Sequence, residues 1–169
     1  MCLILEHKHS LEKIKEQDAL IAELQAGEYY KTHQPVSDKQ ITSSELYALL
    51  RSLFPGIAVN LGDSYRFLCH YDDITEFLVQ DVTNKMPYIS DRQNISSFDC
   101  NVFANRLLGQ FSVPGWSDLC FGKAWLTIPA HALNIMIADD RKFWWIEPQT
   151  DELLEYNYYK PENVRWIEL

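Results

Sequence analysis

The sequence contains no long apolar stretch. The N-terminal run Met1–Leu5 is apolar but turns polar at Glu6, so it is too short for a signal peptide or a membrane span. No later segment approaches the roughly 18 apolar residues that a spanning helix needs. We therefore expect a cytoplasmic protein that has no membrane partner.

Closely spaced cysteines are also absent. The four cysteines are Cys2, Cys69, Cys100 and Cys120, and no two of them form a CxxC pair. A zinc site built from thiolates therefore has little support. Because a chain of 169 residues can bury a core without disulfides, we expect free thiols in a reducing compartment.

Basic residues are outnumbered by acidic ones. The chain has 24 Asp and Glu residues against 15 Lys and Arg residues, which gives a formal net charge of -9. Such a surface repels phosphate backbones, so we expect no nucleic-acid partner. Hydrophobic residues make up 47% of the sequence, which is typical of a globular domain and not of a disordered chain.

The first part of the chain is predicted to be helical. Residues 9–27 place apolar side chains at helical spacing among many charges, and Gly27 ends the pattern. This amphipathic helix could pack on the domain or pair with another chain, so self-association is one expected interaction. We divide the chain into an N-terminal helical extension, residues 1–59, and a core, residues 60–169, within one compact unit.

Helices precede strands along the rest of the chain. A capping pattern at Thr42–Glu45 predicts a helix that stops at Pro55–Gly56, and Ser97–Gly109 has the pattern of another helix. Aromatic and β-branched residues then predict strands in four segments, 124–128, 132–138, 142–146 and 164–167. This segregation predicts an α+β fold in which a helical part is followed by an antiparallel sheet.

Three residues stand in the order that thiol chemistry needs. Cys100 lies in the first turn of the predicted helix, where the helix dipole favours a thiolate. His131 begins one strand, and Glu147 ends the next. A hairpin that turns at Asp139–Asp140 places His131 roughly opposite Glu147, where a carboxylate could hold the imidazole as the base for the thiol. The pattern therefore predicts a nucleophile, a base and an orienting carboxylate.

Ordinary structural roles are open for each of these three residues. A cysteine on a helix is often a small buried hydrophobe, and a histidine near a strand is often a satisfied core group. Cys100, His131 and Glu147 could instead bind zinc, although no fourth His or Cys ligand follows from the sequence.

Three segments carry a resemblance to a known family. They are Phe98–Ala104, Ile128–Asn134 and Trp145–Asp151. These segments resemble the C-terminal protease domain of a mushroom agglutinin, a fungal chimerolectin that has stand-alone relatives in bacteria and phages. The resemblance covers about residues 60–169. The galactose-binding lectin domain of the agglutinin has no counterpart, because the sequence has no β-trefoil repeat.

The resemblance implies a papain-like fold and a calcium-dependent cysteine protease. The positions that match the Cys-His-Glu triad of the family are Cys100, His131 and Glu147. Asp99 and Asp151 flank this triad and are the candidate calcium ligands, while a helix cap and a turn are the alternative roles for them.

Four more polar residues are candidates near the triad. An oxyanion needs a donor besides the backbone N–H of the cysteine, and a side-chain amide upstream is the usual one in papain-like sites. Gln93 and Asn94 are the oxyanion candidates. Gln149 and Asn134 are expected to hydrogen-bond around the triad.

The function predicted from these residues is that of a cysteine hydrolase, either a protease or an amidase. Cys100 would attack a peptide or amide substrate and form a thioester, with His131 as acid and then base. Two alternatives are open. One is an acyl or amine transferase that uses the same triad, and the other is a non-catalytic binding or assembly module that retains the fold.

Overall fold

Three helices, three 3₁₀ turns and eight strands make up the folded body. The computed structural model describes residues 13–15, 17–18, 21, 33–89 and 98–169. The helices are α2 (Ser43–Leu53), α3 (Tyr71–Gln80) and α4 (Cys100–Phe111), and the 3₁₀ turns are η1 (Thr83–Lys85), η2 (Tyr156–Tyr158) and η3 (Pro161–Asn163). The strands are β1 (Gln40–Thr42), β2 (Ala58–Asn60), β3 (Tyr65–Phe67), β4 (Phe121–Thr127), β5 (Ala130–Ile137), β6 (Phe143–Glu147), β7 (Glu152–Glu155) and β8 (Val164–Glu168).

The main sheet is mixed, and not antiparallel throughout as the sequence predicts. Its six strands follow the order β2-β8-β4-β5-β6-β7, and β1 pairs with β3 in a separate two-stranded sheet. β2 runs parallel to β8, whereas the other neighbours in the main sheet are antiparallel. The α+β class is confirmed. The parallel edge was not predicted, because β2 has only three residues and its partner ends the chain.

The start of α2 follows the capping pattern in the sequence. The Glu45 N–H donates to Thr42 Oγ1 at 3.2 Å, and the Thr42 N–H donates to Glu45 Oε2 at 3.0 Å. Two backbone donors that the helix leaves unpaired are thereby satisfied. The predicted helix start at Thr42–Glu45 is confirmed.

The start of α4 lies later than the sequence predicts. Asp99 is the cap: its Oδ1 accepts hydrogen bonds from the backbone N–H groups of Asn101 and Val102, at 3.1 and 3.3 Å. The helix therefore begins at Cys100 and not near Ser97. It continues past Gly109 to Phe111, because Phe111 is buried and stacks on Phe121 of β4 at 3.7 Å between ring centroids.

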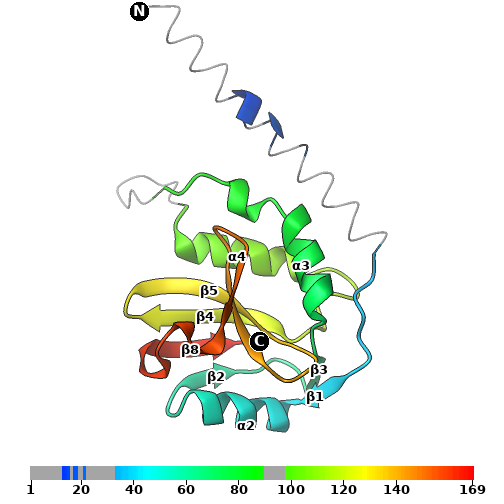
Figure 1. Ribbon diagram of the computed structural model, residues 1–169, viewed down its shortest axis with the longest axis vertical. Coiled ribbons are helices and arrows are strands. Elements are labelled where there is room, and N and C mark those ends of the chain that lie inside the picture. Colours follow the sequence, from blue (N-terminus) through cyan, green and yellow to red (C-terminus); the bar gives the residue numbers. More distant parts are fainter. Residues whose placement is uncertain (1–12, 16, 19–20, 22–32, 90–97) are drawn as a thin grey trace, which may run out of the picture.

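The core lies on both faces of the main sheet. α3 and α4 lie on one side of the sheet, and α2 lies on the other (Figure 1). Below the sheet, the fully buried Phe54 at the end of α2 makes edge contacts with Phe143 and Trp145 of β6 and with Tyr156. Because α2 contributes to this core and β2 pairs with β8, both belong to the same folded body as the later strands.

Little of the predicted N-terminal helix is described. Residues 13–15, 17–18 and 21 are helical, and Ile14 and Ile21 are 52% and 53% exposed. The remainder of segment 9–27 lies outside the described residues. Self-association through this helix and the division of the chain at residue 59 stay predictions.

Replacement of Phe54 by alanine tests the core below the sheet. Removal of a fully buried ring leaves a cavity against three other aromatic rings, so we expect a loss of about 3–5 kcal/mol in the free energy of unfolding. Tyr47→Ala is the matched control on α2, because Tyr47 is 48% exposed; its effect should stay within about 0.5 kcal/mol. Urea unfolding measures both, and equal effects would contradict this packing.

Candidate functional site

Cys100 stands at the N-terminal end of α4, with its side chain partly buried. The capping bonds of Asp99 fix the backbone of the first turn, and the thiol is therefore held at a defined place above the sheet. The other two described cysteines, Cys69 and Cys120, are fully buried. Burial raises the pKa of the Cys120 thiol to about 12, and it raises the pKa of Cys69 as well.

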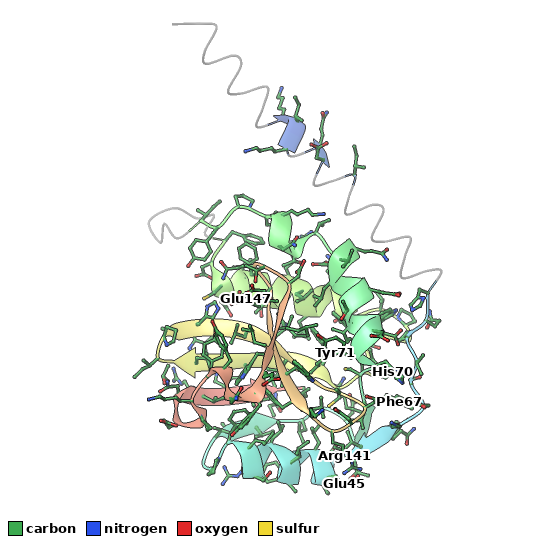
Figure 2. The ribbon with its side chains drawn as sticks, in the orientation of Figure 1. Glu45, Phe67, His70, Tyr71, Arg141 and Glu147 are labelled. Atoms are coloured by element: carbon green, nitrogen blue, oxygen red, sulfur yellow. The ribbon has the colours of Figure 1, made fainter. Side chains whose placement is uncertain are left out.

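His131 and Glu147 are brought together by neighbouring strands. His131 is the second residue of β5, and Glu147 is the last residue of β6. His131 Nε2 lies 2.6 Å from Glu147 Oε2, and both side chains are mostly buried. A carboxylate can only accept, so Nε2 carries the proton and donates it, while Nδ1 points elsewhere. Figure 2 shows Glu147 close to α4, far from Glu45 and Arg141 beside α2.

Glu147 is itself fixed by the turn that follows β6. Its second carboxylate oxygen, Oε1, accepts hydrogen bonds from the backbone N–H and the side-chain Nε2 of Gln149, at 3.3 and 3.2 Å. The backbone carbonyl of Glu147 accepts from the N–H groups of Thr150 and Asp151. Both oxygens of the carboxylate are therefore committed, and the imidazole has one fixed orientation. We call Cys100, His131, Glu147 and Gln149 the His131 site.

Among the described residues, Cys100 and His131 make no hydrogen bond with each other. A thiol that reacts as a nucleophile needs a base within hydrogen-bond reach. The site thus presents an imidazole, a carboxylate and a carboxamide in fixed positions, with a thiol beside them that no base engages.

Asn134, a sequence candidate for a contact with the triad, points elsewhere. It is fully buried, and its Nδ2 donates to the backbone carbonyls of Ala104 in α4 and Gly122 in β4, at 3.0 and 3.2 Å. It ties α4 to the sheet, and no hydrogen bond joins it to His131 or Glu147. The two oxyanion candidates, Gln93 and Asn94, lie outside the described residues.

A cluster of buried oxygen atoms lies next to the turn after β6. Asn84 Nδ2 donates to Asp151 Oδ2, and the Thr83 N–H donates to Asp81 Oδ2 at 2.8 Å. Within the described part of the chain, five buried side-chain oxygens have no hydrogen-bond donor, and four of them belong to this region: Asp81 Oδ1, Thr83 Oγ1, Asn84 Oδ1 and Asp151 Oδ1. Asp81 and Thr83 are 1% and 0% exposed. We call these four residues the oxygen cluster.

The charges of the oxygen cluster favour a bound cation. Burial raises the pKa of Asp151 to about 7, and the nearby charge of Asp81 adds to the shift. Burial also raises the pKa of Asp81, although hydrogen bonds from Thr83 and the positive charge of Arg106 lower it in part. Unpaired, buried carboxylate, amide and hydroxyl oxygens are the donor set that suits Ca²⁺.

The calcium ligands named from the sequence are only partly brought together. Asp151 belongs to the oxygen cluster, whereas Asp99 is committed to the cap of α4. Asp81, Thr83 and Asn84 were not predicted, because nothing local in the sequence marks them as neighbours of Asp151. Among the described residues no three His, Cys, Asp or Glu side chains group closely enough to hold a metal, so a cation here would depend on amide and hydroxyl oxygens as well.

A separate groove lies between α2, β6 and η2, away from the His131 site. Its volume is about 550 Å³, and Trp144 and Tyr156 supply aromatic surface next to Arg141 and Glu155. Aromatic walls with a few polar groups are typical of small-molecule sites. The sequence analysis did not identify this groove, because its residues come from three separate segments.

The fold places the chain among α+β proteins with a mixed sheet, and two solved structures share it. One is described as "PSL1a-E64 complex"; it aligns with a TM-score of 0.60 at 17% identity and covers 77% of this chain and 50% of its own. The other is Polyporus squamosus lectin bound to human-type influenza-binding epitope Neu5Aca2-6Galb1-4GlcNAc. It aligns with a TM-score of 0.59 at 17% identity, and the alignment covers 77% of this chain and 49% of the lectin chain. The chain spans about half the length of these structures. At such identity the likeness shows the fold alone.

This comparison contradicts the prediction of an enzyme. One of the solved structures that share the fold is described as a lectin bound to a sugar epitope, and neither description names a peptidase. The prediction of a cysteine peptidase or amidase is therefore wrong on this finding. A peptide or amide substrate finds no support in the comparison, and acyl or amine transfer stays a prediction. The resemblance to the mushroom agglutinin is borne out only as a likeness in fold to a solved lectin structure.

Sequence comparisons add no family. No protein-family model matches the chain, and no curated protein matches it. Among the residues that the structure describes, no helix is both long and apolar enough to cross a membrane. The cytoplasmic location and the absence of a nucleic-acid partner stay predictions.

Replacement of Glu147 by alanine tests how firmly the His131 site is held. The change removes the acceptor of His131 and of Gln149, so we expect a loss of about 1–3 kcal/mol in the free energy of unfolding. Glu162→Ala is the matched control, because Glu162 is exposed; its effect should stay within about 0.5 kcal/mol. Thermal and urea unfolding measure both, and a neutral Glu147→Ala would contradict the fixed pair.

Proposed function

We propose that the chain is a non-catalytic binding module that retains a papain-like scaffold, and that its ligand is a carbohydrate held at the His131 site. The observation that carries the proposal is the fixed His131–Glu147 pair beside a thiol that no base engages. Such a site is suited to recognition, because its polar groups are held in fixed orientations before a ligand binds.

The polar groups of the His131 site suit a sugar. A sugar presents adjacent hydroxyl groups that both donate and accept hydrogen bonds. The imidazole of His131 on β5, the carboxylate of Glu147 at the end of β6 and the carboxamide of Gln149 in the turn that follows offer both functions. One structure that shares the fold is described as a lectin with a bound trisaccharide epitope, and this trisaccharide supplies the probe for the test.

A binding titration tests the proposed ligand. We expect the trisaccharide Neu5Acα2-6Galβ1-4GlcNAc, used as the probe, to bind the protein in isothermal titration calorimetry. Glu147→Gln removes the charge that orients His131, so it should weaken the affinity about tenfold or more. Glu162→Gln is the matched control and should bind like the unchanged chain. Equal affinity of both variants, or no binding at millimolar trisaccharide, would contradict the proposal.

The absence of turnover needs its own experiment, because binding alone does not exclude chemistry. We expect no cleavage of casein by the protein, with calcium or without it, over a day. Cleavage that requires Cys100 would overturn the non-catalytic proposal.

We also propose that the oxygen cluster binds calcium. The resemblance to the agglutinin family implies calcium, and the unpaired oxygens of Asp81, Thr83, Asn84 and Asp151 fit that ion. A bound cation would neutralise the carboxylates. It would also hold the turn that begins at Glu147, because Asp151 donates its backbone N–H to the Glu147 carbonyl at 2.8 Å.

Calcium should therefore stabilise the folded protein. Since a ligand that binds only the folded state stabilises it by RT ln(1 + [L]/Kd), we expect the Tm to rise by several degrees, about 4 °C or more, when millimolar CaCl₂ replaces EDTA. Asp151→Asn should abolish the rise. Asp140→Asn, an exposed control in the turn after β5, should keep it. A Tm that is the same in CaCl₂ and in EDTA would contradict the calcium site.

A further inference from the structure

A lysine is buried beneath α4. Lys123 is the third residue of β4, and it is only 5% exposed. On β5 its neighbour is the buried Asn134, and on β8 its neighbour is Glu168. Burial of an ammonium group costs desolvation free energy unless nearby charges or hydrogen bonds compensate it. The contacts of Lys123 show which groups do so.

The ammonium group is bonded to the first part of α4. Lys123 Nζ donates to Asn101 Oδ1 at 2.5 Å and to Asn105 Oδ1 at 2.6 Å. These two asparagines are four residues apart, so they lie on the same face of the helix. Asn101 directly follows Cys100. The lysine therefore joins the turn that carries the thiol to the middle of β4.

The positive charge of Lys123 also lies near the turn of α4 that carries the thiol. Its Nζ lies 6.0 and 5.8 Å from the ring centres of Trp125 and Trp166, which cover it from the sheet. Burial lowers the pKa of Lys123, and the charges of Glu168, Cys100 and Asp99 oppose that shift. Lys123 Nζ is bonded to Asn101, the residue directly after Cys100, so its positive charge lies near the first turn of α4.

An apolar side chain of similar length would fill the same space without this cost of desolvation. Lysine differs from it in two respects, the hydrogen bonds to α4 and the positive charge near Cys100. Both act on the turn that carries the thiol. None of the sequence motifs and none of the residues of the His131 site accounts for Lys123.

We propose that Lys123 is a positioning residue of the His131 site, which holds the first two turns of α4 on β4 and sets a positive charge beside Cys100. This inference rests on the proposed function only in taking the His131 site as the ligand site. As a consequence, a negatively charged group of a ligand should bind more tightly beside Cys100 when Lys123 is present than when it is replaced by an uncharged residue.

Alkylation of Cys100 by two probes of nearly equal size tests whether the positive charge of Lys123 acts at the thiol. Iodoacetamide is neutral and iodoacetate is anionic, and mass spectrometry of the Cys100 peptide gives both rates. Lys123→Met should lower the ratio of the iodoacetate rate to the iodoacetamide rate about threefold or more, because a unit charge near the thiol is lost. A purely structural effect would change both rates together and leave the ratio unchanged.

Two further variants complete the experiment. Lys123→Gln keeps a hydrogen-bond donor without the charge, so it should lower the ratio as Lys123→Met does, and it serves if the Met variant does not fold. Lys142→Met removes an exposed lysine that pairs with Asp140, so it should leave the ratio unchanged. An unchanged ratio in the Lys123 variants would overturn the inference.

Amide hydrogen exchange tests whether Lys123 holds the first two turns of α4 on β4. Lys123→Met should raise amide exchange in residues 101–105 at least about tenfold, whereas Lys142→Met should not. Unchanged exchange in the Met variant would overturn the positioning role. Neither readout uses a sugar, so failure of trisaccharide binding would count against the proposed function alone.

Discussion

The hydrogen bonds between α4 and the sheet are the constraint on which the described site depends. Asn134 donates to backbone carbonyls of both α4 and β4, and Lys123 donates to two asparagines of α4. Buried donors of this kind have few alternative arrangements, because each one must find an acceptor. They fix α4 in one position on the sheet, and this position determines where Cys100, the first residue of α4, lies.

The other half of the His131 site is fixed by sheet pairing and by a turn. β5 and β6 bring His131 to Glu147, and Gln149 commits the second carboxylate oxygen. The same turn ends at Asp151, which belongs to the oxygen cluster. A cation there and a ligand at Glu147 would both act on one short segment, so we expect each to favour the other. The site is therefore a junction of α4, the β5–β6 pair and the turn after β6.

Local patterns in the sequence predicted the parts of this arrangement that depend on near neighbours. The capping pattern gave the start of α2, and the hairpin gave the approach of His131 to Glu147. Contacts between distant segments were missed: the parallel pairing of β2 with β8, the buried Lys123, and Asp81 beside Asp151. The prediction of an enzyme was wrong for a different reason, because the order of a thiol, an imidazole and a carboxylate along a chain does not determine their chemistry.

The central claim is that the ligand binds at the His131 site. Backbone amide NMR shifts during a titration with Neu5Acα2-6Galβ1-4GlcNAc test it most directly. The account predicts that the largest shifts fall on Cys100, His131, Glu147 and Gln149, and that they saturate together. Shifts confined to the groove at Arg141–Trp144, or no shifts at saturating sugar, would contradict it.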